Sequence, residues 1–336
     1  MSAIFIHGLG AVSPAGWGVP ALREVMAINQ PLPVQFLLRP GWNKKLSVRP
    51  IPPPPARPAF LGHPRLRRAA IQSQHTVAAA LEALGPDAAL VQSGAIRLGI
   101  IVCTMAGSVT YSRRFYEEAL LNPATASPLL FPETVFNAPA SHLAAFLNSP
   151  GINYTLVGDE GTFLQGLALA AGWLTDGLAD ACVVVGAEEQ DWIVADAVRL
   201  FQKSAVHTGG AGALYLKCQS TARAVLSTIT DAFPFTKLQN RAAAVRRMRH
   251  QLGTGTPGEL LCDSEQSQAV QPDWPGWRLS PKAILGEAFN ASAAWQCVLA
   301  CDQIQAGRVP AASVSIVGAN QQAIGARFIQ SPISPV

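Results

Sequence analysis

The segment of residues 151–174 constrains the fold of this chain more than any other part of the sequence. Residues 152–156 alternate apolar side chains with polar or small ones, which predicts a strand, and an apolar helix then runs to residue 174. Between them, Gly-Asp-Glu-Gly at residues 158–161 forms a tight turn. A strand that turns sharply into a buried helix directs one side chain at the helix N-terminus. Here that side chain is an acid, either Asp159 or Glu160.

A helix N-terminus carries unpaired N–H groups and a partial positive charge, so it holds anions and lowers the pKa of an acid placed there. Enzymes use such a turn to keep a cysteine as its thiolate. No cysteine of this chain falls in the turn. The cysteines show neither a C-x-x-C pair nor a metal-ligand spacing, which indicates free thiols in a reducing cytoplasm and no metal site. They are Cys103, Cys182, Cys218, Cys262, Cys297 and Cys301.

Strands and helices alternate along much of the chain. Near-continuous Val and Ile runs at residues 97–103 and 179–189 predict strands buried on both faces, which favours an α/β fold with layered sheets. A first strand is expected at residues 4–12, a Pro-rich extended surface segment at 30–64, and helices at 67–84 and 112–121. In the second half we expect strands at 209–216, 222–228 and 260–263, helices at 242–252 and 291–306, and a last strand at 314–317.

The composition favours a large interface with a partner. Hydrophobic residues make up 49% of the 336 residues and charged residues only 14%, so little charge is present to cover the surface of a monomer. The net charge of +4 comes with two short basic runs but no aromatic interleaving, which argues against nucleic-acid binding. The first residues resemble a strand rather than a signal peptide, and no apolar run reaches about 18 residues, so no membrane span is expected.

Several motifs resemble those of the β-ketoacyl synthases, enzymes of the thiolase fold. Residues 131–137 match the family pattern F-P-x-x-x-x-N, residues 179–189 resemble A-D-x-x-x-x-G-G-x-E, and residues 8–16 resemble the opening G-x-G-x-V-S-P-x-G. The resemblance implies a layered α-β-α-β-α fold in one compact unit made of two repeated halves, without a cofactor. We expect the halves at residues 1–200 and 201–336, the second shortened, with the strand at 209–216 opening the second repeat.

The same resemblance shows that the catalytic positions of a synthase are vacated. The family places its cysteine in the turn before the helix, where this chain has Glu160. The first family histidine follows a strand in an H-G-T-x-T turn, and here that turn contains Ser264 instead. The second lies in K-x-x-x-G-H, and here Lys282 is followed at the histidine position by Glu287. We expect Lys282 to form an ion pair with Glu265 or Glu287, and His207 is the one histidine expected near this region.

A first half that keeps the family motifs, vacated catalytic positions and an apolar composition together resemble the chain length factors, inactive homologues that pair with an active β-ketoacyl synthase and shape its product tunnel. The small size and divergent second half resemble the bacterial aryl polyene type more than the aromatic polyketide type. This resemblance implies an acyl carrier protein that docks on basic residues. The expected tunnel and interface residues are Asn153, Tyr154, Thr155, Leu156, Val157, Phe163, Trp192 and Phe136, and the docking residues are Arg65, Arg67, Arg68, Arg246, Arg247 and Arg249.

Two other functions stay open at this point. The first is an acyl-thioester decarboxylase or hydrolase in which Glu160 takes part, although a carboxylate is a weak nucleophile. The second is a scaffold protein that binds acyl chains without any synthase. A buried anion held by helix N–H groups is the structural alternative to catalysis for Glu160.

Overall fold

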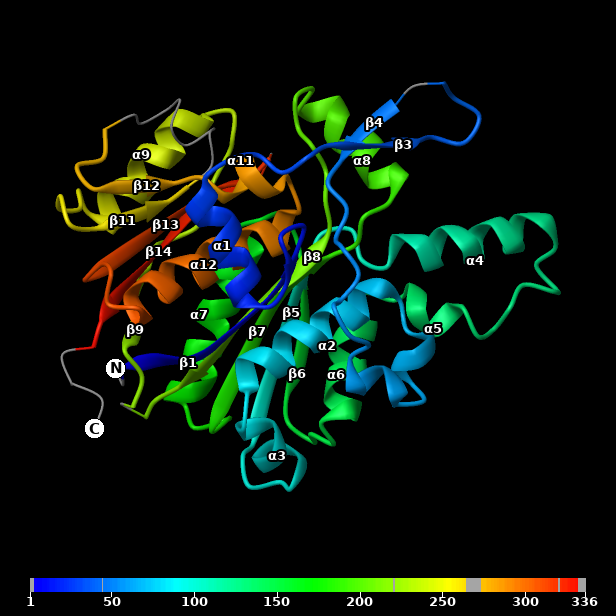
Figure 1. The fold of residues 1–336 in the computed structure, drawn as a ribbon, viewed down its shortest axis with the longest axis horizontal. Coiled ribbons are helices and arrows are strands. Elements are labelled where there is room, and N and C mark those ends of the chain that lie inside the picture. Colours follow the sequence, from blue (N-terminus) through cyan, green and yellow to red (C-terminus); the bar gives the residue numbers. More distant parts are fainter. Residues whose placement is uncertain (1–2, 44, 220, 264–272, 320, 332–336) are drawn as a thin grey trace.

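The computed structural model describes residues 3–43, 45–219, 221–263, 273–319 and 321–331, and two groups of five strands form its centre (Figure 1). Both groups have the same spatial order: numbered along the chain within each group, the strands lie 1-5-4-2-3. The parallel and antiparallel pairings also match. The first group is β1 (Ile4–Ser13), β8 (Gly210–Lys217), β7 (Ala181–Glu188), β5 (Leu98–Thr104) and β6 (Asn153–Val157). The second is β9 (Ala224–Ile229), β14 (Gln322–Gln330), β13 (Ala311–Val317), β11 (Leu260–Cys262) and β12 (Trp277–Leu279).

The helices complete five layers. α7 (Thr162–Thr175) and α12 (Phe289–Gln305) lie between the two strand groups and contact both. The outer face of the first group is covered by α2 (Ile71–Leu84) and α6 (Ala138–Phe146), and that of the second by α9 (Arg241–Leu252). The two groups join where β1 pairs antiparallel with β9. The predicted layered α/β fold of two repeated halves is therefore confirmed.

Apolar and small residues allow the central helices to pack closely between the two strand groups. All residues of β5 and β7 are buried, as the continuous Val and Ile runs predict. In α12 nearly every residue is buried, which is expected of a helix covered by a sheet on both sides. A side chain at Gly186 of β7 would place its Cβ 2.2 Å from the carbonyl oxygen of Asn290, so α12 packs at a distance that only glycine allows.

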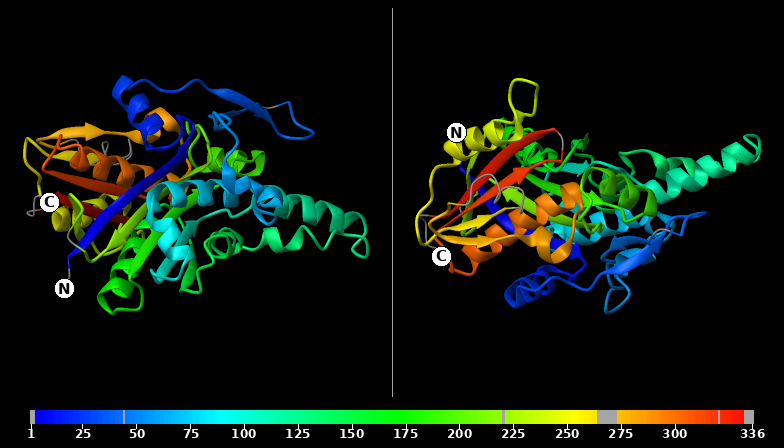
Figure 2. Two further views of the ribbon diagram at one scale, coloured as in Figure 1. Left: turned by 60° about the horizontal axis from the view of Figure 1, so that its bottom comes forward. Right: turned by 90° about the horizontal axis from the view of Figure 1, so that it is seen from above.

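The remaining elements surround this core. Between residues 30 and 64 the chain is mostly extended, but it also forms a hairpin of β3 (Gln35–Leu38) and β4 (Lys45–Val48) that packs on α8 (Trp192–Phe201). Figure 2 shows α4 (Val109–Leu121) projecting from the body as an arm. The short elements are α1 (Val19–Ile28), α3 (Asp87–Gln92), α5 (Phe131–Thr134), α11 (Pro281–Leu285), β2 (Gly16–Trp17), β10 (Phe233–Pro234), η1 (Ala59–Gly62) and η2 (Leu66–Arg68).

Three expectations about the elements were wrong. The strand at residues 209–216 exists as β8, but it pairs with β1 and β7 and completes the first group instead of opening the second. We therefore propose that the first half extends through β8, beyond residue 200. The strand at 314–317 is not the last, because β14 follows and pairs with it. The helix expected from residue 67 begins only at Ile71, after the 3₁₀ turn η2. No helix in the described part of the chain is long and apolar enough to cross a membrane.

Candidate functional site

The N-termini of the two central helices meet at one point. β6 leads into the turn at residues 158–161 and then into α7, as predicted. Asn290, in the first turn of α12, donates from Nδ2 to the carbonyl oxygen of Gly158 at 2.9 Å, which ties the start of one helix to the other. Asp159 is the acid that faces the N-terminus of α7, since its Oδ1 accepts from the N–H of Gly161 at 3.2 Å. The side chain of Glu160 therefore points elsewhere.

Glu160 belongs to a buried ion cluster centred on Lys282. The Lys282 ammonium donates to Glu160 Oε2 and, at 2.9 Å, to Glu287 Oε2. Glu287 Oε1 in turn accepts from the N–H of Phe289 at the start of α12, at 2.8 Å. Glu160 is 1% exposed and Glu287 6%. The predicted pair of Lys282 with Glu287 is thus confirmed, and the alternative partner Glu265, like Ser264, lies outside the described residues.

The cluster holds one ammonium between two carboxyl groups, and this arrangement shifts the pKa values of Glu160 and Lys282. Burial, together with the charge of Glu287, raises the pKa of Glu160 to about 8. Burial disfavours the charged form of Lys282, but the two neighbouring carboxyl groups outweigh it and raise the pKa of the amine. At pH 7 the favoured state therefore has Lys282 charged and Glu160 protonated. A protonated carboxyl group is not a nucleophile.

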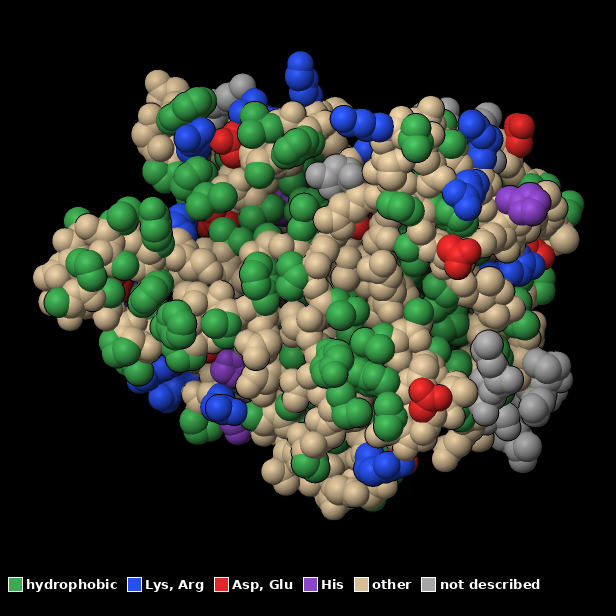
Figure 3. Space-filling view, turned by 180° about the vertical axis from the view of Figure 1, so that it is seen from behind, with side chains coloured by type: hydrophobic (Ala, Val, Ile, Leu, Met, Phe, Trp, Pro, Cys, Tyr) green, Lys and Arg blue, Asp and Glu red, His purple; other side chains and the backbone are tan. Residues whose placement is uncertain are grey.

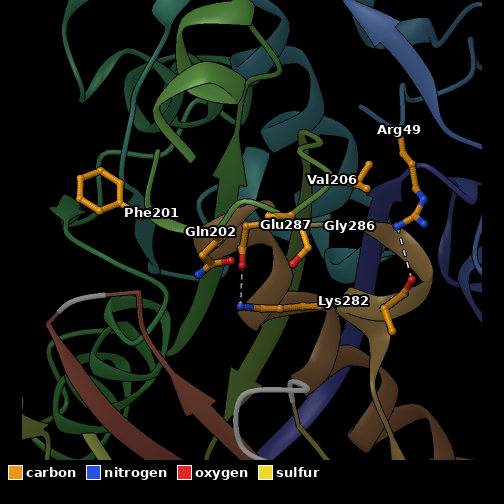
Figure 4. A pocket seen from close by; sticks show the side chains of 10 residues that line it. Arg49, Phe201, Gln202, Val206, Lys282, Gly286 and Glu287 are labelled. Carbon is orange, nitrogen blue, oxygen red and sulfur yellow. Dashed lines mark hydrogen bonds and ion pairs between the residues drawn. The ribbon is translucent and has the colours of Figure 1, made fainter. Parts of the chain in front are cut away.

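A cavity of about 430 Å³ opens beside this cluster (Figure 4). Lys282, Gly286 and Glu287 line it from α11 and the loop after it, and Phe201 lies at one end while Arg49 lies at the other. Sequence reasoning missed Arg49, because an isolated arginine in a Pro-rich segment carries no local pattern.

Two of the aromatic residues expected at the tunnel, Phe163 and Trp192, do not line this cavity. Phe163 is fully buried in the core, and Trp192 packs against the apolar cluster of Leu46, Val48 and Ala195. Both side chains therefore contribute to apolar packing and not to the lining of the cavity.

Cysteine and histidine chemistry is absent from the head of α7 in the described structure. The Cys103 thiol lies in β5 against Gly166, and burial raises its pKa, so it stays protonated. His207 is the one histidine adjacent to the cluster, as expected. The next residue, Thr208, donates its N–H to the carbonyl oxygen of Glu287 at 2.9 Å. Burial lowers the pKa of His207 to about 4, so its imidazole is neutral at physiological pH.

The strand expected at a partner interface lies at the edge of its group. Within the described residues β6 pairs with β5 on one side and has no strand on the other. Tyr154 is 54% exposed and Val157 53%, so both present apolar surface at this edge. Figure 3 shows hydrophobic side chains spread over the back face of the molecule and over the projecting arm. The exposed apolar residues of the arm and the loop after it are Tyr116, Leu120, Leu121, Leu129, Phe131, Val135 and Phe136.

The two basic runs differ in exposure. Arg65, Arg67 and Arg68 are exposed around η2, and Arg246 and Arg247 are exposed on α9. Arg249 was wrongly included among the docking residues. Its side chain is 7% exposed and turns inward, 3.5 Å from the Asp263 carboxylate and over the ring of Trp274. At 3.6 residues per turn, two successive positions turn the helix by about 200°, so Arg249 lies on the side of α9 opposite the exposed Arg247.

Comparison with solved structures decides the fold. A structure described as a type II PKS acyl-carrier protein in complex with its ketosynthase matches over 98% of this chain and 99% of its own, with a TM-score of 0.81 and 15% identity. The chain has the ketosynthase fold. The ishigamide ketosynthase/chain length factor matches with a TM-score of 0.76 and 17% identity, over 98% of this chain and 99% of that chain.

A third structure of this fold is the ketosynthase ApeO in complex with its chain length factor ApeC from Xenorhabdus doucetiae. It matches over 98% of both chains, with a TM-score of 0.75 and 14% identity. No protein-family profile matches the sequence, and no curated protein matches it either. TM-scores of 0.75–0.81 establish the ketosynthase fold, whereas identities of 14–17% are too low to assign an activity.

Proposed function

We propose that this chain is the non-catalytic, chain-length-factor-type subunit of a heterodimeric β-ketoacyl synthase, and that it shapes the tunnel of the growing acyl or polyene chain. The observation that carries the proposal is the closed Lys282 cluster at the head of α7. A ketosynthase needs a thiolate and two imidazoles there. This chain instead fills the place with a buried acid whose partner is a lysine, and a protonated carboxyl group offers no nucleophile.

The exposed edge of β6 supports the second part of the proposal. An unpaired strand edge exposes a row of N–H and C=O groups and is a template for pairing with another chain. Tyr154 and Val157 add apolar area to that edge, which suits a lasting interface. A partner synthase would extend the first strand group through β6 about a pseudo-twofold axis. Solved structures of this fold include complexes of a ketosynthase with a chain length factor, which is consistent with this arrangement.

The finer assignments are part of the same proposal. We expect the partner to carry the reactive cysteine, and an acidic acyl carrier protein to approach the assembly at Arg65, Arg67 and Arg68 or at Arg246 and Arg247. The aryl polyene type is our preferred class, and the six free cysteines suit a reducing cytoplasm.

Co-expression with a cysteine-bearing synthase tests the proposal. We expect the two chains to co-purify as a complex of one copy each, and the complex to condense malonyl and acyl groups from a carrier protein. The chain alone should give no acyl adduct by intact-mass spectrometry. Formation of an acyl adduct or a condensation product by this chain alone would refute the non-catalytic role.

A second candidate is an acyl-thioester decarboxylase or hydrolase that uses Glu160. The observation in its favour is the pKa of about 8, since a group that titrates near neutral pH can exchange protons during a reaction. Against it, Glu160 is 1% exposed and does not line the cavity. Turnover of malonyl-carrier protein by the purified chain, lost in Glu160→Gln, would favour this candidate over the first.

A further inference from the structure

Arg49 is a buried guanidinium without an anion. It follows β4 and is only 6% exposed. Its Nε donates to the carbonyl oxygen of Leu32 at 2.8 Å, and its Nη1 to that of Ala283 at 3.4 Å. Among residues 3–43, 45–219, 221–263, 273–319 and 321–331 no carboxylate pairs with it, and its Nη2 has no hydrogen-bond partner. Two carbonyl oxygens hold the side chain in place but do not neutralise its charge.

Other buried cations of the chain are neutralised. Lys282 has two carboxyl groups, and Arg249 has Asp263 at 3.5 Å. An unpaired buried charge is costly, and proteins normally place an anion beside it. Burial lowers the pKa of Arg49, and no nearby acid counteracts this. No acid among the described residues thus supplies the matching negative charge, and a bound anion would supply it.

The surroundings of Arg49 provide room for a ligand. The guanidinium lines the 430 Å³ cavity described above, which lies in the size range of small-molecule pockets. Arg49 and Phe201 lie at opposite ends of the cavity (Figure 4). The apolar side chains of Ala205 and Val206 also line it. The Lys282 ammonium is occupied by its two carboxyl groups, so Arg49 contributes the only unpaired charge among the described lining residues.

We propose that this cavity binds a short apolar monocarboxylate, with the ligand carboxylate on Arg49 and its hydrocarbon part along Val206 and Ala205 toward Phe201. One unpaired positive charge matches one negative charge, which favours a carboxylate over a doubly charged phosphate. The free Nη2 donors give the carboxylate a charge-assisted hydrogen bond. The site belongs to this chain alone and goes beyond the proposed partner function.

Calorimetric titration of the full-length chain with hexanoate, and separately with inorganic phosphate, tests the proposal. We expect hexanoate to bind and to raise the melting temperature, and phosphate to bind at least tenfold more weakly. Arg49→Met should weaken hexanoate binding at least tenfold, because it removes the charge-assisted hydrogen bond to the ligand carboxylate. Arg57→Met replaces an exposed arginine of the same Pro-rich segment and should leave binding unchanged.

A second pair of variants covers the case in which Arg49→Met does not fold. Ser204 is exposed and lines the cavity, so both variants at this position should fold. Ser204→Glu should weaken hexanoate binding several-fold by repulsion, while Ser204→Gln, of similar size, should have little effect. Equal binding of hexanoate by both Ser204 variants, unchanged binding in Arg49→Met, or phosphate binding as strong as hexanoate binding would overturn the proposal.

Discussion

Replacement of Glu160 by glutamine tests the charge state of the buried cluster. Burial and Glu287 raise the pKa of Glu160 from 4.5 to about 8. At pH 7 folding must therefore add a proton to a carboxyl group that is ionised in the unfolded chain. At 1.36 kcal/mol for each pH unit between 4.5 and 7, this costs roughly 3 kcal/mol. Glutamine has the shape of the protonated acid and avoids the cost, so Glu160→Gln should stabilise the protein by up to about 3 kcal/mol at pH 7.

The sign of the pH dependence follows from the raised pKa. The stability that wild-type Glu160 contributes is fully present below pH 4.5, and it is lost as the pH rises toward 8. The advantage of Glu160→Gln should therefore grow from about 1 kcal/mol or less at pH 5 to about 3 kcal/mol at pH 7, a slope of roughly 1.4 kcal/mol per pH unit.

Urea denaturation of the full-length chain between pH 5 and pH 8 measures this difference. At pH 7 the midpoint of Glu160→Gln should lie about 1 M higher, for a denaturant slope near 3 kcal/mol/M. Glu24→Gln, at an exposed position of α1, serves as the control and should show no such trend. If Glu160→Gln is less stable than the wild type by the same amount at every pH, Glu160 is ionised and its protonated state at neutral pH is refuted.

Three further changes follow from the structure. Lys282→Met leaves two buried carboxyl groups without a cation and should lower the free energy of unfolding at pH 7 by about 3–5 kcal/mol, measured by urea denaturation. The loss should be smaller at pH 5, where protons neutralise carboxyl groups more readily. Equal losses at pH 5 and pH 7 would contradict this expectation. Tyr154→Asp on β6 should weaken the complex with a partner synthase at least tenfold in a binding assay, whereas Leu238→Asp, at a fully exposed loop position, should not. Asp191→Ala removes the side chain that accepts from the N–H of Ile193 and caps α8, so unfolding should become easier by about 1 kcal/mol; an unchanged urea midpoint would show that the cap contributes nothing.

The fold could be predicted from the sequence where its patterns are strong. The buried strands β5 and β7 are continuous apolar runs, and the turn between β6 and α7 has a glycine at each end. β14 was missed, because its Gln-Ala-Ile-Gly-Ala-Arg start has neither clear alternation nor a long apolar run, and only its pairing with β13 and β9 makes it a strand. The place of β8 was also misjudged, because the pairing of strands distant in sequence has no local signal.

The candidate site could be predicted in part. The spacing from Lys282 to Glu287 indicated their ion pair, since residues near each other in the chain can be placed together without the fold. The contact of Lys282 with Glu160 spans 122 positions and depends on how α7 and α11 pack. No local sequence pattern could therefore predict it. The inward turn of Arg249 likewise depends on Asp263 and Trp274, which other segments supply.

The matching strand orders of the two groups have an electrostatic consequence. α7 and α12 each come after the third strand of their own group, so the repeated architecture aims two helix dipoles at the same spot. Each dipole brings about half a positive charge there. Asp159 and Glu287 each accept a hydrogen bond from a backbone N–H at one of these N-termini, whereas Glu160 is bound by Lys282. The two helix N-termini therefore create a positive electrostatic potential at this point, which favours negatively charged groups whatever their residue type.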